Sequence, residues 1–180
     1  CFAPDRAQMH VVNHLTGETT KEIRNVLVES ARIARGKIAD VKKADVSKFD
    51  ALIFPGGFGA AVNLSSFAVD GAKASVNADV AALARAFYKA KKPIGVICSA
   101  PALRAKVLAG EKLTLTIGNE VGTARAIESL SHHHEACGAR GFVVDRTHKI
   151  VSTPAYMLAG RISEAARGIE KLVAKVLELA

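Results

Sequence analysis

PIGVICSAPALRAKVLAG (residues 93–110) is the segment that decides the fold, because its character changes at its centre. The apolar run at 94–97 is typical of a buried strand, and the periodic apolar residues after Pro101 are typical of a helix. Cys98 lies at the junction, followed by the small residues Ser99 and Ala100. The segment therefore predicts a strand, a sharp turn that carries a thiol, and a helix.

Strands and helices alternate through the rest of the chain. The strands are near-continuous apolar runs, which are usual in parallel sheets covered on both faces. Only the stretch 60–76 has no clear period. We therefore expect an α/β fold, a three-layer sandwich with a mostly parallel sheet and a small antiparallel hairpin at 142–154. The patterns predict strands at 10–15, 49–59 (running into a glycine-rich loop), 113–118, 142–145 and 149–154, and helices at 16–36, 78–92, 123–130 and 157–180.

The composition is that of a globular domain. The chain has 180 residues, 49% of them hydrophobic and 23% charged, which is enough for one domain spanning 1–180 with a single core. No apolar run reaches the roughly 20 residues of a membrane span, so we expect no membrane partner. Cys1, Cys98 and Cys137 are far apart and odd in number, which argues against a disulfide framework. A reducing compartment, and hence a cytoplasmic protein, is the expectation.

The net charge of +8 raises the question of a nucleic-acid partner. The basic residues are scattered, with local doublets only at 42–43 and 91–92, and aromatic residues make up 5% of the chain. Base stacking needs aromatic side chains in a defined segment, and none is found. We therefore expect no nucleic-acid partner.

Two strand ends carry unusual chemistry, and both are expected at the same edge of a parallel sheet. One is the glycine-rich loop 55–59, and the other is Cys98 with Ser99 and Ala100. The loop lacks the Lys-Ser/Thr of a phosphate loop and a long helix directly after it, so a nucleotide cofactor is not predicted. Glycines in such a loop also leave backbone N–H groups unobstructed, as an oxyanion hole requires.

Cys98 permits two interpretations. In many hydrolases the nucleophile lies in a sharp turn between a strand and a helix, called the nucleophile elbow, and this crowded turn needs small neighbouring residues. The N–H groups at a helix N-terminus also favour the thiolate. A free cysteine is also among the most commonly buried residues, and then it only fills space.

Several motifs together resemble one family. Residues 54–59 (FPGGFG), 98–101 (CSAP), 115–118 (LTIG) and 151–157 (VSTPAYM), with the opening stretch 1–18, are similar to the ElbB family, named for enhancing lycopene biosynthesis. That family is described as an isoprenoid-biosynthesis-linked glyoxalase within the PfpI-like branch of the class I glutamine amidotransferase-like superfamily. The resemblance covers essentially the whole chain.

The resemblance implies a flavodoxin-like sandwich that forms a homodimer and has Cys98 as its nucleophile. It also implies that the backbone N–H groups of Gly57 and Ser99 face the thiolate and any oxyanion formed there. Family members are associated with a lyase-type conversion of glyoxal, a small carbonyl substrate, to glycolate without a cofactor. A non-catalytic role, in which Cys98 senses oxidants or the fold serves a regulatory or chaperone-like purpose, is the alternative.

This chain departs from the family pattern in two respects. It begins at what resembles the second strand of the family, so we expect one strand–helix unit, with the glutamate that contacts the thiol, to be missing. The general acid/base is therefore unassigned, and His14 is the candidate within the chain. No histidine follows the last strand, which disfavours glutamine amidotransfer. The run His132–His134 with Glu135 and Cys137 is expected to be a solvated loop without a metal, because it lacks tetrahedral-site spacing.

Overall fold

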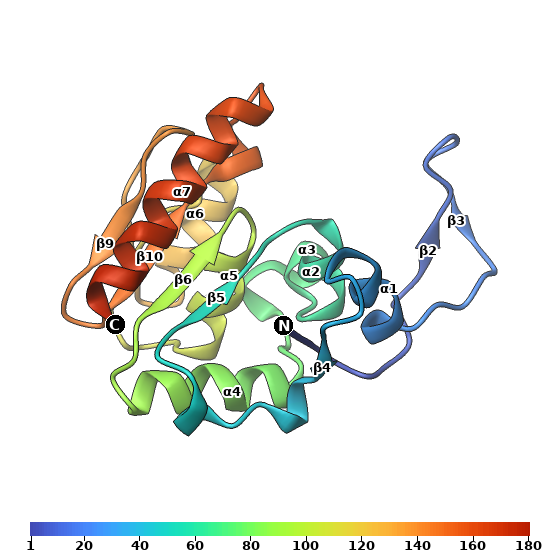
Figure 1. Cartoon of the computed structure of the whole chain (residues 1–180). Helices are drawn as coiled ribbons and strands as arrows, with labels where there is room; N and C mark the ends of the chain where they lie inside the picture. Colours follow the sequence, from blue (N-terminus) through green and yellow to red (C-terminus); the bar gives the residue numbers. More distant parts are fainter. The chain divides into compact units, whose positions relative to one another are not determined.

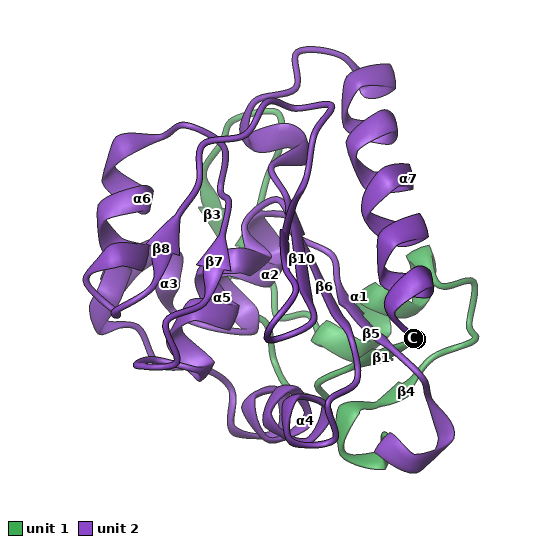
Figure 2. Ribbon diagram, turned by 90° about the vertical axis from the view of Figure 1, so that its left-hand side faces the viewer, with its two compact units in different colours: residues 1–45 green, residues 46–180 purple.

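The computed structural model describes residues 1–180, which fall into two compact units (Figure 2). Unit 1 spans Cys1–Asp45 and unit 2 spans Val46–Ala180. None of the helices combines the length and the apolar character needed to cross a membrane.

Unit 1 contains two small pairs of strands and one α-helix (Figure 1). One pair is parallel and joins β1 to β4, and the other is an antiparallel hairpin that joins β2 to β3. The elements are β1 (Phe2–Ala3), β2 (Val11–Val12), β3 (Thr19–Thr20), α1 (Val26–Ile33), β4 (Ala39–Asp40) and η1 (Val41–Lys43).

The helix expected at 16–36 is much shorter in the structure. The β-branched pair Thr19–Thr20 lies in strand β3 opposite β2, where its side chains are favoured. The side chain of Asn25 accepts a hydrogen bond from the Val28 N–H at 3.1 Å and caps the helix, so α1 begins only at Val26. Ile23, which the apolar period placed on the helix face, is 85% exposed.

Unit 2 holds a four-stranded sheet of order β5-β6-β10-β9. Strands β5, β6 and β10 run parallel, and β9 closes the sheet antiparallel to β10. A separate parallel pair joins β7 to β8. The strands are β5 (Leu52–Phe54), β6 (Ile94–Ile97), β7 (Thr114–Leu115), β8 (His133–His134), β9 (Val143–Asp145) and β10 (Ile150–Thr153).

Helices cover both faces of this sheet, with α7 on one side and α5 on the other (Figures 1 and 2). The predicted α/β fold, mostly parallel with a small antiparallel hairpin, is thus confirmed. The helices are η2 (Val46–Lys48), α2 (Phe58–Asn63), α3 (Phe67–Asp70), η3 (Gly71–Lys73), α4 (Ala78–Lys89), α5 (Ala100–Val107), α6 (Val121–Glu128), η4 (Ala155–Met157) and α7 (Ile162–Leu179).

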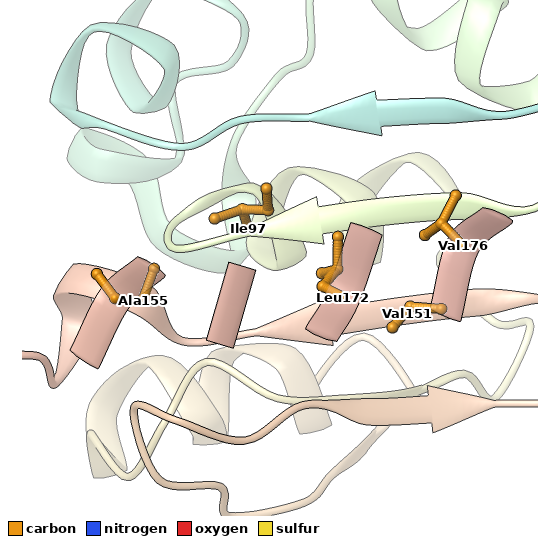
Figure 3. Close-up of a cluster of buried hydrophobic side chains, with 6 residues drawn as sticks. Ile97, Val151, Ala155, Leu172 and Val176 are labelled. Carbon is orange, nitrogen blue, oxygen red and sulfur yellow. The ribbon is translucent and has the colours of Figure 1, made fainter. Parts of the chain in front are cut away.

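The core between the sheet and α7 is made of aliphatic side chains (Figure 3). Leu172 and Val176 of α7 are completely buried and pack with Val151 of β10 and Ile97 of β6. Burying such a side chain contributes about 1.5–3 kcal/mol, so this layer fixes α7 on the sheet. Because Ile97 directly precedes Cys98, the same packing anchors the end of β6 that carries the thiol.

The stretch 60–76, for which the pattern predicts no element, forms the short helices α2 and α3 and the turn η3. One local expectation in unit 2 is wrong. The run of histidines is not a solvated loop, because His133–His134 pair in parallel with β7 as strand β8. His132 is buried, where its ring Nδ1 accepts a hydrogen bond from the Leu113 N–H at 3.1 Å.

Asp145, at the end of β9, gives the fold a pH-dependent contribution. Burial by itself raises the pKa of this carboxyl, but the N–H groups of Thr114 and His148 at 2.8 and 2.9 Å and the His148 ring at 2.8 Å outweigh burial and lower the pKa. A lowered folded-state pKa means stability that is present above the unfolded value and lost as the pH falls through the folded value.

We therefore expect Asp145→Asn to reduce the free energy of unfolding by about 1–2 kcal/mol at pH 7. The difference from the wild type should shrink as the pH drops below about 4, where the free aspartate carboxyl titrates. Urea unfolding at a series of pH values measures both effects. A difference that stays constant down to the lowest pH would show that the charge of Asp145 contributes nothing.

Candidate active site

The centre of the site is a sharp turn between strand β6 and helix α5. Cys98 occupies the turn with φ +61°, in the left-handed region that few residues other than glycine adopt. Its N–H donates a hydrogen bond to the Thr153 carbonyl oxygen at 2.9 Å, which ties the turn to the end of β10. Strained backbone of this kind is concentrated at functional sites, where the surrounding structure holds it in place.

The glycine-rich loop after β5 contacts this turn directly. A Cβ atom on Gly56 would lie 2.5 Å from the Cys98 Cβ and the Ile97 carbonyl oxygen and 2.8 Å from the Ser99 nitrogen, so only glycine fits. The Ser99 hydroxyl donates a hydrogen bond to the Gly57 carbonyl oxygen at 3.3 Å. The structure therefore brings together the two strand ends that the sequence singles out.

Gly57 has a different reason to be glycine. Its φ of +100° is strained for any other residue, whereas a Cβ atom there would meet no atom within 4 Å. The residue precedes the short helix α2, whereas the long helix α4 begins only at Ala78, as the sequence predicts. A side chain at Gly57 would thus cost backbone energy rather than create a clash.

The three cysteines lie in different environments. Cys98 is half-buried at the N-terminal end of α5, where helix N–H groups and the positive end of the helix dipole favour an anion. Cys137 is also half-buried, but burial raises the pKa of its thiol and the nearby Glu135 raises it further. Cys1 is exposed at the start of unit 1. Of these thiols, Cys98 has the setting of a nucleophile.

A cavity of about 500 Å³ opens within unit 2 beside the turn at Cys98 between β6 and α5, the elbow of this protein. Ser99 and Ala100, the two residues after Cys98, line it, together with Phe54 and Pro55 from the end of β5. Further apolar walls come from α2, α3, α5 and η4. The cavity thus lies at the carboxyl ends of two parallel strands, where ligands bind in open α/β sheets.

Glu120 is the only side chain of the cavity wall that carries a charge. Its carboxylate accepts hydrogen bonds from the Thr123 N–H at 2.5 Å and the Gly122 N–H at 2.7 Å, at the start of α6. These bonds, the contact with Thr123 foremost, lower the pKa of the carboxyl. Glu120 is therefore engaged as a helix cap and is a poor base.

His132 and His134 of unit 2 have structural partners. The His132 ring contacts the Ala105 carbonyl oxygen at 2.8 Å, and burial lowers the pKa of its imidazole. His134 accepts a hydrogen bond from the Ile117 N–H at 3.3 Å, and Pro154 follows the last strand where amidotransferases have a histidine. His14 lies exposed in the turn between β2 and β3 of unit 1, and its role as acid/base stays a prediction.

Sequence reasoning missed the walls of the cavity. Those formed by α2 and α3 belong largely to the stretch 60–76, which is divided between two short helices and therefore shows no sustained helical period. Ile117, from the strand predicted at 113–118, and Met157, from the start of the helix predicted at 157–180, also line the cavity and were not predicted as site residues.

Comparison with known proteins agrees with this geometry. Residues 37–153 match the DJ-1/PfpI family. The chain is 48% identical to the ES1 protein homolog, mitochondrial, of Rattus norvegicus, over 99% of this chain and 70% of the relative. It is 47% identical to the glutamine amidotransferase-like class 1 domain-containing protein 3, mitochondrial, of Homo sapiens, over 99% of this chain and 69% of the relative.

A solved structure shows the same fold over nearly the whole chain. It is an isoprenoid biosynthesis protein with an amidotransferase-like domain from Ehrlichia chaffeensis, which matches with a TM-score of 0.92 and 36% identity. The match covers 99% of this chain and 82% of that protein. The flavodoxin-like, class I glutamine amidotransferase-like fold that the sequence predicts is confirmed.

One expectation is overturned by the same findings. A cytoplasmic location is wrong, because the rat and human relatives, nearly half identical to this chain, are both named mitochondrial. The number and spacing of the cysteines argue for a reducing environment and do not distinguish one such compartment from another.

Proposed function

The chain belongs to the DJ-1/PfpI family, and from this premise we propose that it is a glyoxalase of the ElbB type, linked to isoprenoid biosynthesis. It converts glyoxal and related 2-oxoaldehydes to 2-hydroxy acids without a cofactor, and Cys98 is the nucleophile. The observation that carries the proposal is the left-handed backbone of Cys98 at the junction of β6 and α5, beside a cavity large enough for a substrate.

The reaction balances without an external oxidant. The Cys98 thiolate adds to the aldehyde carbon of glyoxal and forms a C–S bond, which gives a hemithioacetal. An acid/base group moves the proton of this carbon to the neighbouring carbonyl through an enediol, so the first carbon is oxidised and the second reduced. Water then hydrolyses the resulting thioester, which breaks the C–S bond and releases glycolate and the thiol.

The developing oxyanion needs donors close to Cys98. The backbone N–H groups of Gly57 and Ser99 are the donors we propose, and the contact between the Ser99 hydroxyl and the Gly57 carbonyl holds the two residues together. Donors fixed in advance stabilise charge without reorganisation in the transition state. The tight fit of Gly56 against the elbow supports this role, because it leaves little freedom for the loop.

The experiment that tests the proposal follows glyoxal and glycolate by NMR with the natural full-length protein and no added cofactor. We expect one glycolate to form for each glyoxal consumed, over many turnovers. Failure to form glycolate, with oxidation of Cys98 by peroxide to a sulfenic acid, would instead support the oxidant-sensing role, which needs no turnover.

A further inference from the structure

We infer that the preferred substrates are neutral 2-oxoaldehydes that carry an apolar chain, which the cavity beside the elbow encloses. The inference rests on the proposed function and specifies its substrate class.

The cavity is too large for glyoxal alone. Its volume of about 500 Å³ lies in the range of roughly 300–1,000 Å³ over which pockets enclose drug-sized ligands. Glyoxal is the smallest dialdehyde and would leave most of this space to water. An apolar group that displaces water from such walls gains affinity in proportion to the area it buries.

The walls are apolar and offer no positive charge. Aromatic and aliphatic side chains form most of the lining, and no lysine or arginine belongs to it. A phosphate or carboxylate on the substrate would therefore enter the cavity without a counter-charge, which is costly. The chief apolar residues are Phe54, Phe58, Leu64, Phe67, Leu103 and Ile117.

The polar groups of the lining are occupied by the protein itself. The Ser65 hydroxyl lies 3.4 Å from the Ala61 carbonyl oxygen and 3.3 Å from the Phe67 nitrogen. Ser99 donates to Gly57, and the Glu120 carboxylate caps α6. The cavity beyond the elbow thus selects for shape and apolar surface rather than for polar groups on the chain.

The aromatic side chain of Phe58 lines the cavity and is also 71% exposed. A substrate chain longer than the cavity would continue over this side chain.

The first test compares methylglyoxal with 2-oxooctanal, which bears the same reacting group on a longer chain. Each methylene moved out of water contributes about fourfold, so we expect kcat/KM for 2-oxooctanal to exceed that for methylglyoxal by at least about 50-fold. Ala126→Phe fills the cavity from α6 and should reduce this ratio to about fivefold or less. Ala124→Phe, on the same helix but outside the lining, is the matched control and should keep the wild-type ratio. Equal kcat/KM values for the two aldehydes, or equal ratios in the two variants, would overturn the inference.

A binding measurement separates this inference from the proposed reaction. Cys98→Ala protein is titrated by NMR with 2-octanone and acetone, which cannot turn over. We expect 2-octanone to bind at least about 50-fold more tightly than acetone, and the added Ala126→Phe substitution to abolish the difference. If neither aldehyde is converted but this difference is seen, the proposed reaction fails and the apolar site stands. If the difference is missing, the apolar site is refuted even when glyoxal is converted.

Discussion

Cys98→Ala protein is expected to fold like the wild type and to convert glyoxal at least about 1,000-fold more slowly. The reason is that each later step needs the C–S bond that the thiolate forms, and no side chain of the neighbouring cavity is a nucleophile of comparable strength. Alanine and cysteine have similar backbone strain energies at φ +61°, so the loss of turnover should not come from unfolding. Initial rates of glycolate formation and the thermal unfolding midpoint measure the two quantities.

Cys137→Ala is the matched control, since Cys137 is also half-buried and free but has a thiol whose pKa is raised by burial. Its turnover should stay within about twofold of the wild type, as is usual for a residue that takes no part in the transition state. Comparable turnover of Cys98→Ala and the wild type would mean that Cys98 only fills space at the end of β6.

Gly56→Val is expected to displace the elbow, with losses in both stability and rate. Its Cβ would overlap the Ile97 carbonyl oxygen and the Ser99 nitrogen, which are backbone atoms and cannot turn aside as a flexible side chain would. We expect the free energy of unfolding to fall by about 3 kcal/mol. Displacing the reacting atoms by about 1 Å costs on the order of 100-fold in rate, so turnover should fall by at least that factor.

Gly59→Ala serves as the control for this substitution. A Cβ atom on Gly59 would meet nothing within 4 Å, and the residue lies inside helix α2. Alanine there should leave turnover unchanged and raise stability by roughly 0.5–1 kcal/mol. Equal turnover and equal free energies of unfolding in Gly56→Val and Gly59→Ala would show that the contact between the glycine loop and the elbow contributes to neither activity nor stability.

The elbow was predictable because its signals are local. The apolar strand at 94–97, the small residues after Cys98 and Pro101 in the first turn of α5 all lie within one short segment. The start of α1 was missed for the opposite reason: a continuous apolar period from Ile23 onward outweighed the single capping residue Asn25. A period measures burial on average, whereas a cap is decided by one hydrogen bond.

The cavity was not predictable from the sequence. Its walls come from the end of β5, from α2 and α3, from α5, from α6 and the segment before it, and from η4, which are far apart in the chain. A strand end can be placed at a sheet edge from its position in an alternating pattern, but the space left between packed helices depends on how their side chains meet. The close approach of Gly56 to the elbow is likewise a property of the fold and leaves no local trace beyond a glycine.

The state of Cys98 during turnover is the most direct test of its role as a nucleophile. Protein that is converting glyoxal is quenched with acid within milliseconds to seconds, and the peptide containing Cys98 is analysed by mass spectrometry. We predict a glycolyl thioester on the Cys98 sulfur that hydroxylamine removes as the hydroxamate, with Cys137 unmodified. Covalent catalysis by this residue would be contradicted if glycolate accumulated while Cys98 stayed unmodified at every quench time. Glycolate formation that continued unchanged with hydroxylamine present would contradict it as well.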